Sequence, residues 1–382
     1  MTLEMAARVD RVEPSATLAI SNAATTLRAD GVDVVDLSVG EPDFPTPQPI
    51  VDAAKAALDA GHTGYTTSSG IMPLREAIVE KLAADGIEAT PEEIIVTPGG
   101  KQALYEIFQA YIDDGDEVVL LDPAWVSYEA MAKLAGADLT RVDTAPYEFQ
   151  LEPALDDLSA AVSDATKLLV INSPSNPTGA VYSGDALAGV RDLAVEHDFM
   201  VLSDEIYDRI TYGAEVTSMG AVPRMADRTI TLNGFSKAYA MTGWRLGYVH
   251  APAPIIEAAK KVHSHSVSCA VNFVQHAGVS ALTETDAEVE EMRAAFEHRR
   301  DLLADWFAEL GVDVPVGDGA FYMMVPVAAD DTTWCTTAIE DAHVAMVPGS
   351  AFGAPGYARL SYAASADRLR EGLDRLVDAD LL

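Results

Sequence analysis

Residues 166–204, TKLLVINSPSNPTGAVYSGDALAGVRDLAVEHDFMVLSD, contain the pattern that decides the fold. Two short apolar runs, at 166–172 and 199–204, stand on either side of an amphipathic segment at 185–197. Short apolar runs that alternate with helical segments are typical of βαβ units, whose strands pair in parallel. Ligands in open α/β sheets bind beyond the carboxyl ends of the strands, so the residues that end or follow each run are the first candidates for chemistry.

The same rhythm extends in both directions from this unit. Further strands are predicted at 93–97, 117–122, 229–233 and 246–251, and further helices at 101–112 and 127–136. We therefore expect an α/β fold, with a large domain in which helices flank a mostly parallel sheet.

The two ends of the chain have a different texture. One long charged helix is predicted at 283–310, followed by short strands and a closing helix at 366–377. This α+β pattern indicates a smaller domain, with which the N-terminal residues are expected to pack. The predicted division is 1–44 for the N-terminal part of the small domain, 45–283 for the large domain and 284–382 for the C-terminal small domain.

The composition excludes several classes of function. The 382 residues include 60 acidic and 25 basic side chains, which gives a net charge of −35. Binding to nucleic acid or to an anionic membrane needs clustered Lys and Arg, so neither partner is expected. With 49% hydrophobic residues, the chain is too apolar to be a disordered acidic tail.

Lysine is scarce, with 8 residues against 17 arginines. An acidic, lysine-poor surface suits a salt-rich cytosol, because the Debye length shrinks to about 3 Å at 1 M salt; a halophilic source is therefore our hypothesis. Cys269 and Cys335 are too few for a disulfide framework and have no metal-ligand spacing. No signal peptide or membrane-spanning run is recognisable, so we expect a cytoplasmic protein without a metal.

Lys237 lies in TLNGFSKAYAMTGWRLGYV (231–249), just after a predicted strand. Between Asp227 and Glu257 there is no acidic residue that could pair with it. It is either an ordinary exposed loop lysine or a Schiff-base lysine. In the second case desolvation and a neighbouring cation such as Arg245 make its amine nucleophilic.

Gly99, Gly100 and Lys101 lie where the strand at 93–97 turns into a helix. A helix N-terminus offers unpaired N–H groups and a partial positive charge, and the glycines let a phosphate approach the backbone. The pattern is neither a Walker motif nor GxGxxG, so a plain tight turn is the alternative.

Five other residues have both a structural and a functional interpretation. Asp204 either caps a turn or pairs with a cationic ring nitrogen, and Tyr207 shares its face if a helical turn follows. Asn176 lies in an Asn-Pro turn that could be only a loop. Trp125 is a core aromatic or a stacking platform. Arg359 lies on the solvated face of a strand or captures a carboxylate with both arms of its guanidinium.

Taken together, these segments resemble the class I pyridoxal-phosphate aminotransferases of the aspartate aminotransferase superfamily. The resemblance covers nearly the whole chain, and its segments occur in the family's order. They are SVGEPDFPTP (38–47), GYTTSSGIMPLREAI (64–78), VTPGGKQAL (96–104), PAWVSY (123–128), SPSNPTGAVY (173–182), SDEIYDRI (203–210), NGFSKAYAMTGWRLGY (233–248), GAFY (319–322) and ARLSYA (358–363). The GGK turn is similar to that of the prokaryotic aspartate aminotransferase-like subgroup.

The resemblance implies the type I fold of pyridoxal-phosphate enzymes, the cofactor pyridoxal 5′-phosphate and a homodimer. It gives each motif residue a role. Lys237 holds the cofactor, and its phosphate is bound by Gly99, Gly100, Lys101, Ser236, Arg245 and Tyr65 of the partner subunit. Asp204 pairs with the ring nitrogen, Tyr207 and Asn176 bind the phenolic oxygen, and Trp125 stacks on the ring. The substrate's α-carboxylate is bound by Gly40, Asn176 and Arg359.

The implied reaction moves an amino group between an L-amino acid and 2-oxoglutarate, by a ping-pong mechanism through aldimine and ketimine intermediates with the Lys237 amine as base. Aspartate is the first choice of substrate, since the resemblance places Thr17 and Lys101 at a distal carboxylate. Two departures bear on this. Gly234 replaces a hydroxyl that binds phosphate in many relatives, and Cys269 takes the place of a serine from the partner subunit.

Several alternatives remain open at this point. A broader or aromatic amino-acid range comes second, and a carbon–sulfur β-lyase would share the fold, the cofactor and Lys237. A transcription regulator with a related domain would need an N-terminal DNA-binding module, for which the roughly 15 residues before the predicted fold leave no room. A protein that only binds would not require the lysine, the ring partners and the carboxylate arginine together.

Overall fold

The computed structural model of the protein describes residues 5–14, 16–327 and 330–382, and the side chains of these residues except 16–18. No helix within this part of the chain is long and apolar enough to cross a membrane.

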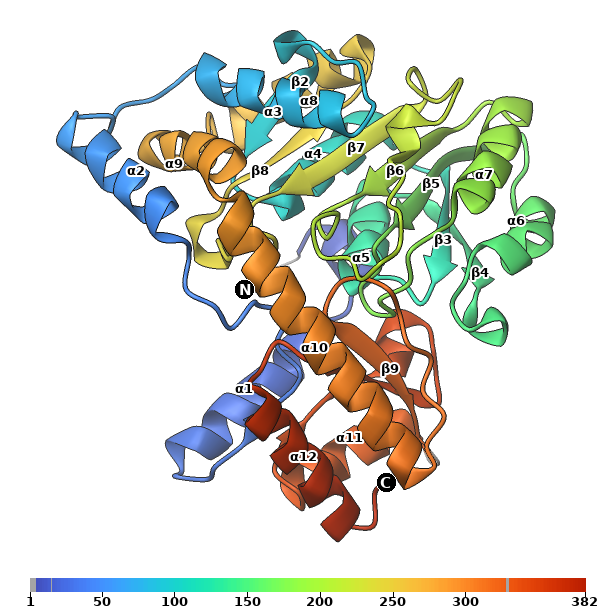
Figure 1. Ribbon diagram of the computed structural model, residues 1–382. Helices are drawn as coiled ribbons and strands as arrows, with labels where there is room; N and C mark the ends of the chain where they lie inside the picture. Colours follow the sequence, from blue (N-terminus) through green and yellow to red (C-terminus); the bar gives the residue numbers. More distant parts are fainter. Residues whose placement is uncertain (1–4, 15, 328–329) are drawn as a thin grey trace.

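A seven-stranded sheet lies at the centre of the larger part of the molecule (Figure 1), in the order β2-β8-β7-β6-β5-β3-β4. Its strands are β2 (Ile94–Thr97), β3 (Glu117–Asp122), β4 (Asp138–Asp143), β5 (Thr166–Asn172), β6 (Met200–Asp204), β7 (Thr229–Gly234) and β8 (Gly247–His250). Within this sheet β8 runs in the opposite direction to the other six strands, so its pairings with β2 and β7 are antiparallel. The prediction of a mostly parallel sheet is therefore confirmed. Strand β4 was not predicted, because at the sheet edge only Val142 of its six residues is buried.

Helices cover both faces of this sheet, which explains why its strands are apolar without alternation. Val118 and Leu120 of β3 pack on one face with α4, α5 and α8, whereas Val119 and Leu121 pack on the other with α6 and α7. The helices of this part are α2 (Gln48–Asp59), α3 (Met72–Ala84), α4 (Gly100–Tyr111), α5 (Val126–Ala135), α6 (Leu155–Ala161), α7 (Gly184–Glu196), α8 (Ala253–Ser266) and α9 (Asn272–Glu284).

The smaller part combines both ends of the chain (Figure 1). An antiparallel sheet has the order β11-β12-β9, and β1 pairs in parallel with β10, with Val35 opposite Val344. The N-terminal segment thus joins the C-terminal one, as expected, while the boundaries at 44 and 283 stay predictions. The elements are α1 (Ala16–Ala29), β1 (Val35–Asp36), α10 (Asp286–Leu310), β9 (Tyr322–Pro326), α11 (Asp331–Glu340), β10 (Val344–Ala345), β11 (Val347–Pro348), β12 (Tyr357–Ser361) and α12 (Ala366–Asp378).

The prediction of one continuous helix at 283–310 is wrong at its N-terminal end. Thr283 and Glu284 belong to α9, and α10 begins only at Asp286. The break falls at Thr285, whose hydroxyl donates to the carbonyl of Ala281 at 2.8 Å. Such a local side-chain bond offers the backbone an alternative to continuing the helix. From this break α10 runs from the large part to the small one (Figure 1).

Candidate active site

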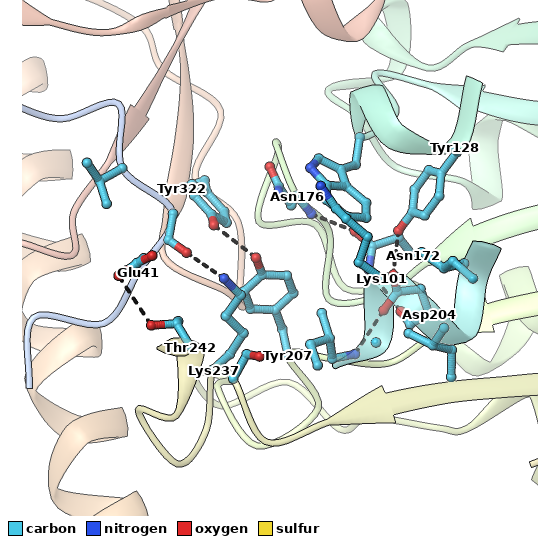
Figure 2. Close-up of a pocket in the computed structure, with 18 of the residues that line it drawn as sticks. Glu41, Lys101, Tyr128, Asn172, Asn176, Asp204, Tyr207, Lys237, Thr242 and Tyr322 are labelled. Carbon is cyan, nitrogen blue, oxygen red and sulfur yellow. Dashed lines mark hydrogen bonds between the residues drawn. The ribbon is translucent and has the colours of Figure 1, made fainter. Parts of the chain in front are cut away.

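A cavity of about 410 Å³ opens between the carboxyl ends of β5 and β6 and the small part of the molecule. It gathers residues from segments far apart in the sequence (Figure 2). The predicted site residues that line it are Gly40, Gly100, Lys101, Trp125, Asn176, Asp204, Tyr207, Ser236, Lys237, Arg245 and Arg359. The convergence that the strand ends predicted is therefore present.

Lys237 is partly buried and projects into this cavity. Its Nζ donates a hydrogen bond to the carbonyl oxygen of Gly40 at 2.5 Å. Burial lowers the pKa of Lys237 to about 8, an effect that the charge of Glu41 opposes and those of Arg359 and Arg245 reinforce. A larger share of the amine is thus neutral near neutral pH, which is the form that can act as a nucleophile or a base. The exposed-loop interpretation of this lysine does not describe the structure.

The N-terminus of α4 forms the second wall of the site. Gly99 precedes the helix with φ +84°, and a Cβ at this position would lie 2.6 Å from Nη2 of Arg245. Only glycine fits here without strain. The guanidinium of Arg245 donates to the carbonyl of Thr242 at 2.7 Å, and Ser236 and Lys101 line the same cavity. Helix N–H groups, two cations and a hydroxyl are groups of the kind that bind a phosphate.

Asp204 ends β6 and is 3% exposed. Its carboxylate accepts from the hydroxyl of Tyr128 at 2.7 Å and from the N–H of Ile206 at 3.2 Å, so it does cap the turn that follows. Burial raises the pKa of Asp204 to about 6, against the effect of these two bonds and of Lys237. A buried carboxylate of this kind is stabilised by a cationic partner.

Arg359 lies on β12 and is 3% exposed, so its place is not the solvated face of a strand. It donates to Oδ1 of Asn176 at 3.0 Å and to the carbonyl of Ser38 at 2.6 Å. Its Nε has no partner, and no carboxylate within the described residues lies within salt-bridge distance of it. Burial lowers its pKa. An unpaired buried cation is costly unless a ligand supplies the anion.

Aromatic side chains and asparagines complete the wall. Trp125 lies below the ammonium group of Lys101, whose Nζ is 4.7 Å from the ring centroid. Burial lowers the pKa of Lys101, with a further contribution from Arg245. Asn176 accepts from Arg359 through Oδ1, which leaves its Nδ2 oriented as a donor.

Among the described side chains, two predicted residues do not line this cavity. Gly99 packs against the guanidinium of Arg245, which separates it from the cavity. Tyr65 is 92% exposed and lies away from the cavity of its own chain. Thr17 belongs to α1, and its side chain lies outside the described residues.

Sequence reasoning did not single out Tyr128, Asn172, Tyr322 and Glu41, which also line the cavity. Asn172 accepts from the N–H of Asn176 at 2.7 Å and donates to the carbonyl of Asp204 at 2.8 Å, so it links two strand ends. Weak signals existed, because Asn172 is the last residue of a predicted strand and Tyr322 belongs to the GAFY segment.

The two departures from the family pattern have different structural settings. A Cβ at Gly234 would lie 3.1 Å from both the Cα of Gly247 and the Cδ1 of Ile206, so this position has little room for a hydroxyl-bearing side chain. Ser236 does line the cavity. Cys269 is partly buried and does not line the cavity of its own chain.

The residues present fit pyridoxal 5′-phosphate. The glycine cradle with its cations suits the phosphate, the buried Asp204 suits a protonated ring nitrogen, and Lys237 suits the aldehyde. Four cations and two carboxylates, Glu41 and Asp204, line the cavity. The site is thus net positive within a chain of net charge −35.

A model of the family "Aminotransferase class I and II" matches residues 32–376. The chain therefore belongs to this family and is a pyridoxal-phosphate-dependent aminotransferase. It is 45% identical to the aspartate/prephenate aminotransferase of Thermus thermophilus over 96% of both chains, and 41% identical to the aspartate aminotransferase of Geobacillus stearothermophilus over 98% of both.

Solved structures show the same fold. That of aspartate aminotransferase from Thermus thermophilus with maleate has a TM-score of 0.95 and 44% identity, and the match covers 99% of this chain and 100% of that one. The structure of an aromatic aminotransferase from Pyrococcus horikoshii matches with a TM-score of 0.88 and 41% identity, over 95% of this chain and all of the other.

Proposed function

We propose that this aminotransferase takes the amino group of L-aspartate and delivers it to 2-oxoglutarate. The observation that carries the proposal is Arg359, a buried cation that has no carboxylate partner among the described residues. A substrate α-carboxylate would supply the missing charge and engage the planar guanidinium. Lys101, a second cation in the same cavity, supports a substrate with a second carboxylate.

The residues that would hold the cofactor follow from their chemistry. The N–H group of Gly100 at the start of α4 would bind the phosphate, together with Lys101, Ser236 and Arg245. The N–H of Gly99 donates to the carbonyl of Thr97 at 2.7 Å, so Gly99 would contribute through its backbone conformation. Asp204 would accept from the ring nitrogen, and Asn176 and Tyr207 would donate to the phenolic oxygen. Trp125 would stack on the ring.

When bound, pyridoxal 5′-phosphate supplies an aldehyde that bonds to amines and a ring that withdraws electrons from the substrate's α-carbon. The amine of Lys237 would hold the cofactor through its aldehyde before a substrate binds. With a substrate amine bound in its place, the free Nζ would lie in the same cavity as the substrate's α-carbon and would serve as the base that takes its proton. The lowered pKa of Lys237 favours the neutral amine that this step requires.

Positioning of the substrate rests on Arg359 and Trp125. By holding the α-carboxylate on one side, Arg359 would fix how the bonds of the substrate's α-carbon are oriented in the cavity. Asp204, held by Tyr128, keeps the ring nitrogen protonated, and this makes the ring a better electron acceptor.

The choice of aspartate is supported by the Thermus and Geobacillus relatives, which are named as aspartate aminotransferases. Because the Thermus enzyme is also named for prephenate, that oxo acid is a second candidate acceptor. The Pyrococcus aromatic aminotransferase supports an aromatic range as the alternative.

A substrate matrix tests these proposals. Aspartate, glutamate, tyrosine and phenylalanine are each paired with 2-oxoglutarate and with prephenate, and kcat/KM is measured. We expect the highest value for aspartate, and a Lys101→Ser variant should lose rate with aspartate more than with phenylalanine. Equal losses with both would argue against a distal carboxylate at Lys101. With an S-substituted cysteine as the amino acid, release of ammonia, pyruvate and the thiol without amino transfer would favour the β-lyase.

The active unit that we propose is a homodimer in which Tyr65 of each chain serves the partner's cofactor phosphate. The exposure of Tyr65 supports this, as does the fixed conformation of its loop. Gln275 of α9 is fully buried, accepts from the N–H of Ile71 at 2.7 Å and donates to the hydroxyl of Thr66 at 3.2 Å. A phenol held out into solvent by a buried network has no use in an isolated chain.

Hybrid dimers test this arrangement. When Tyr65→Phe chains are co-expressed with Lys237→Ala chains, half of the dimers carry one site with both native groups, so activity should recover to about a quarter of the wild type. The matched control pairs wild-type chains with the Tyr65→Phe, Lys237→Ala double variant, whose hybrids should add no fully active site. If the hybrid dimers of the control were active and those of the first mixture were not, Tyr65 would act within its own chain.

A salt-rich cytoplasm is the setting that we propose for the enzyme. It is supported by the net charge of −35 and by the shortage of lysine. Several carboxylates lie mostly in solvent even where they face a basic side chain, among them Asp164, Asp198 and Asp286. Salt would screen the mutual repulsion of such groups.

A further inference from the structure

Tyr322 is the first residue of β9 and has no role so far. Its side chain is 1% exposed, yet it lines the active-site cavity. Its hydroxyl lies 2.9 Å from the hydroxyl of Tyr207, and either of the two can donate. Figure 2 shows this bond as a dashed line between Tyr322 and Tyr207, next to Lys237.

Each phenol has one proton to donate and can accept as well. In the protein alone, Tyr207 and Tyr322 satisfy each other in either direction. Once Tyr207 donates its proton to the phenolic oxygen of the cofactor, as the proposed function requires, it has none left for Tyr322. The bond between the two hydroxyls then persists only if Tyr322 is the donor.

We propose that Tyr322 is a positioning residue that donates to Tyr207 and so strengthens the bond of Tyr207 to the cofactor's phenolic oxygen. This inference rests on the proposed role of Tyr207. Consecutive hydrogen bonds polarise one another, so the second donor makes the first phenol a better donor. Because Tyr322 comes from the small part and Tyr207 from the large one, the effect depends on how the two parts meet.

Two further contacts fix the phenol in place. The ring of Tyr322 faces the guanidinium of Arg359, whose Cζ is 4.7 Å from the ring centroid. The hydroxyl also approaches Gly40 so closely that a Cβ there would lie 2.7 Å from it. Tyr322 therefore requires glycine at position 40 and touches the proposed α-carboxylate arginine. A single side chain contacts the residues proposed to bind the substrate's carboxylate and the cofactor's oxygen.

The consequence is measurable on the bound cofactor. The Lys237 nitrogen that bonds the cofactor can carry a proton, and this positive charge stabilises the negative phenolic oxygen beside it. When the nitrogen loses its proton, the oxygen depends more on hydrogen-bond donors. A donor to the oxygen therefore favours the deprotonated nitrogen and lowers its pKa. Weakening the donor raises the pH at which this proton is lost. The visible absorption of the lysine-bound cofactor reports this pH midpoint without any turnover.

Tyr322→Phe removes the hydroxyl and keeps the ring. Since a donor partner strengthens the next hydrogen bond by roughly 10–30%, we expect the absorption midpoint of the holoenzyme to rise by about 0.2 to 0.7 units. Tyr207→Phe should raise it more, and the double variant should match Tyr207→Phe alone, because Tyr322 acts through Tyr207. The KM for the amino acid should change less than about twofold, since the ring face towards Arg359 is retained.

Tyr362→Phe is the matched control. This phenol is buried in the same part of the molecule, donates to the carbonyl of Ala320 at 3.3 Å and does not line the cavity. Its loss can lower the melting temperature but should not move the absorption midpoint. The proposal is overturned if Tyr322→Phe leaves the midpoint unchanged while Tyr207→Phe shifts it, or if the two shifts add in the double variant. If Tyr207→Phe itself causes no shift, the role of Tyr207 fails and this inference with it.

Discussion

Replacing Asp204 by Asn removes a charge that the fold holds only at a cost. Burial raises the pKa of this carboxyl from 3.8 to about 6, and a shift of about 2 units corresponds to about 3 kcal/mol of free energy. Because the folded-state pKa lies above the unfolded one, the group stabilises the fold fully below pH 3.8. That contribution is lost as the pH rises through 6.

The pH dependence gives the magnitude to be measured. With these two pKa values, about 1.4 kcal/mol of the loss falls between pH 5 and pH 8. Between pH 5 and pH 8, the unfolding free energy of the cofactor-free wild type should fall by about 1.4 kcal/mol more than that of Asp204→Asn, because the asparagine side chain does not titrate. Urea unfolding of both proteins at pH 5 and pH 8 gives the two differences in unfolding free energy. A difference that stays the same at both pH values would refute the argument from burial.

In the holoenzyme the same substitution should be harmful, since the ring nitrogen loses its buried anionic partner. Breaking a buried ion pair costs about 3–5 kcal/mol, so we expect kcat/KM to fall roughly 10²- to 10⁴-fold. Glu205→Gln is the matched control. Glu205 is equally buried, its pKa is raised by burial to about 7, and it bonds to Ser203 and Ser218 outside the cavity. This control should change stability with pH while leaving cofactor binding intact.

Three other perturbations have definite expected results. Arg359→Lys should raise the KM for both the amino acid and the oxo acid roughly 10- to 100-fold in steady-state assays, because a charged hydrogen bond of about 1.5–3 kcal/mol is lost; an unchanged KM would exclude Arg359 from the carboxylate site. Gly99→Ala should weaken cofactor binding at least about tenfold in an absorbance titration. Gly115→Ala is the control, because Gly115 also has a positive φ of +87° but has open space around it; it should lower stability without weakening cofactor binding. If Gly99→Ala and Gly115→Ala weakened cofactor binding equally, Gly99 would have no special role at the phosphate. The melting temperature should rise between about 0.1 M and 2 M KCl as screening increases, and a flat or falling curve would contradict a halophilic adaptation.

Local patterns in the sequence predicted the large sheet well, because its strands are buried on both faces and read as unbroken apolar runs. They failed where burial is one-sided or where a local contact intervenes. Strand β4 lies at an exposed edge and is mostly polar. The break between α9 and α10 depends on the hydroxyl of Thr285, and the helical pattern continues through it.

The site shows the same division. Residues with a motif around them, such as Lys237 and Gly99, were recognisable from sequence. Tyr128 and Tyr322 also lie in such segments, PAWVSY and GAFY, but their roles were not recognisable. Each acts through a partner 76 or 115 residues away in the chain, and only the fold brings the partners together. For Arg359 the sequence left the solvated face of a strand and a carboxylate site both open, and only the fold shows its side chain buried in the wall of the cavity.

Reduction of the holoenzyme with borohydride tests the central claim most directly, since it makes the bond between lysine and cofactor permanent. The cavity holds two lysines, Lys237 and Lys101, and mass spectrometry of the digested protein distinguishes them. We predict a single cofactor adduct, on the peptide that contains Lys237, and no adduct in the Lys237→Ala variant. An adduct on Lys101, or none on either lysine, would contradict the assignment of Lys237 as the residue that bonds the cofactor.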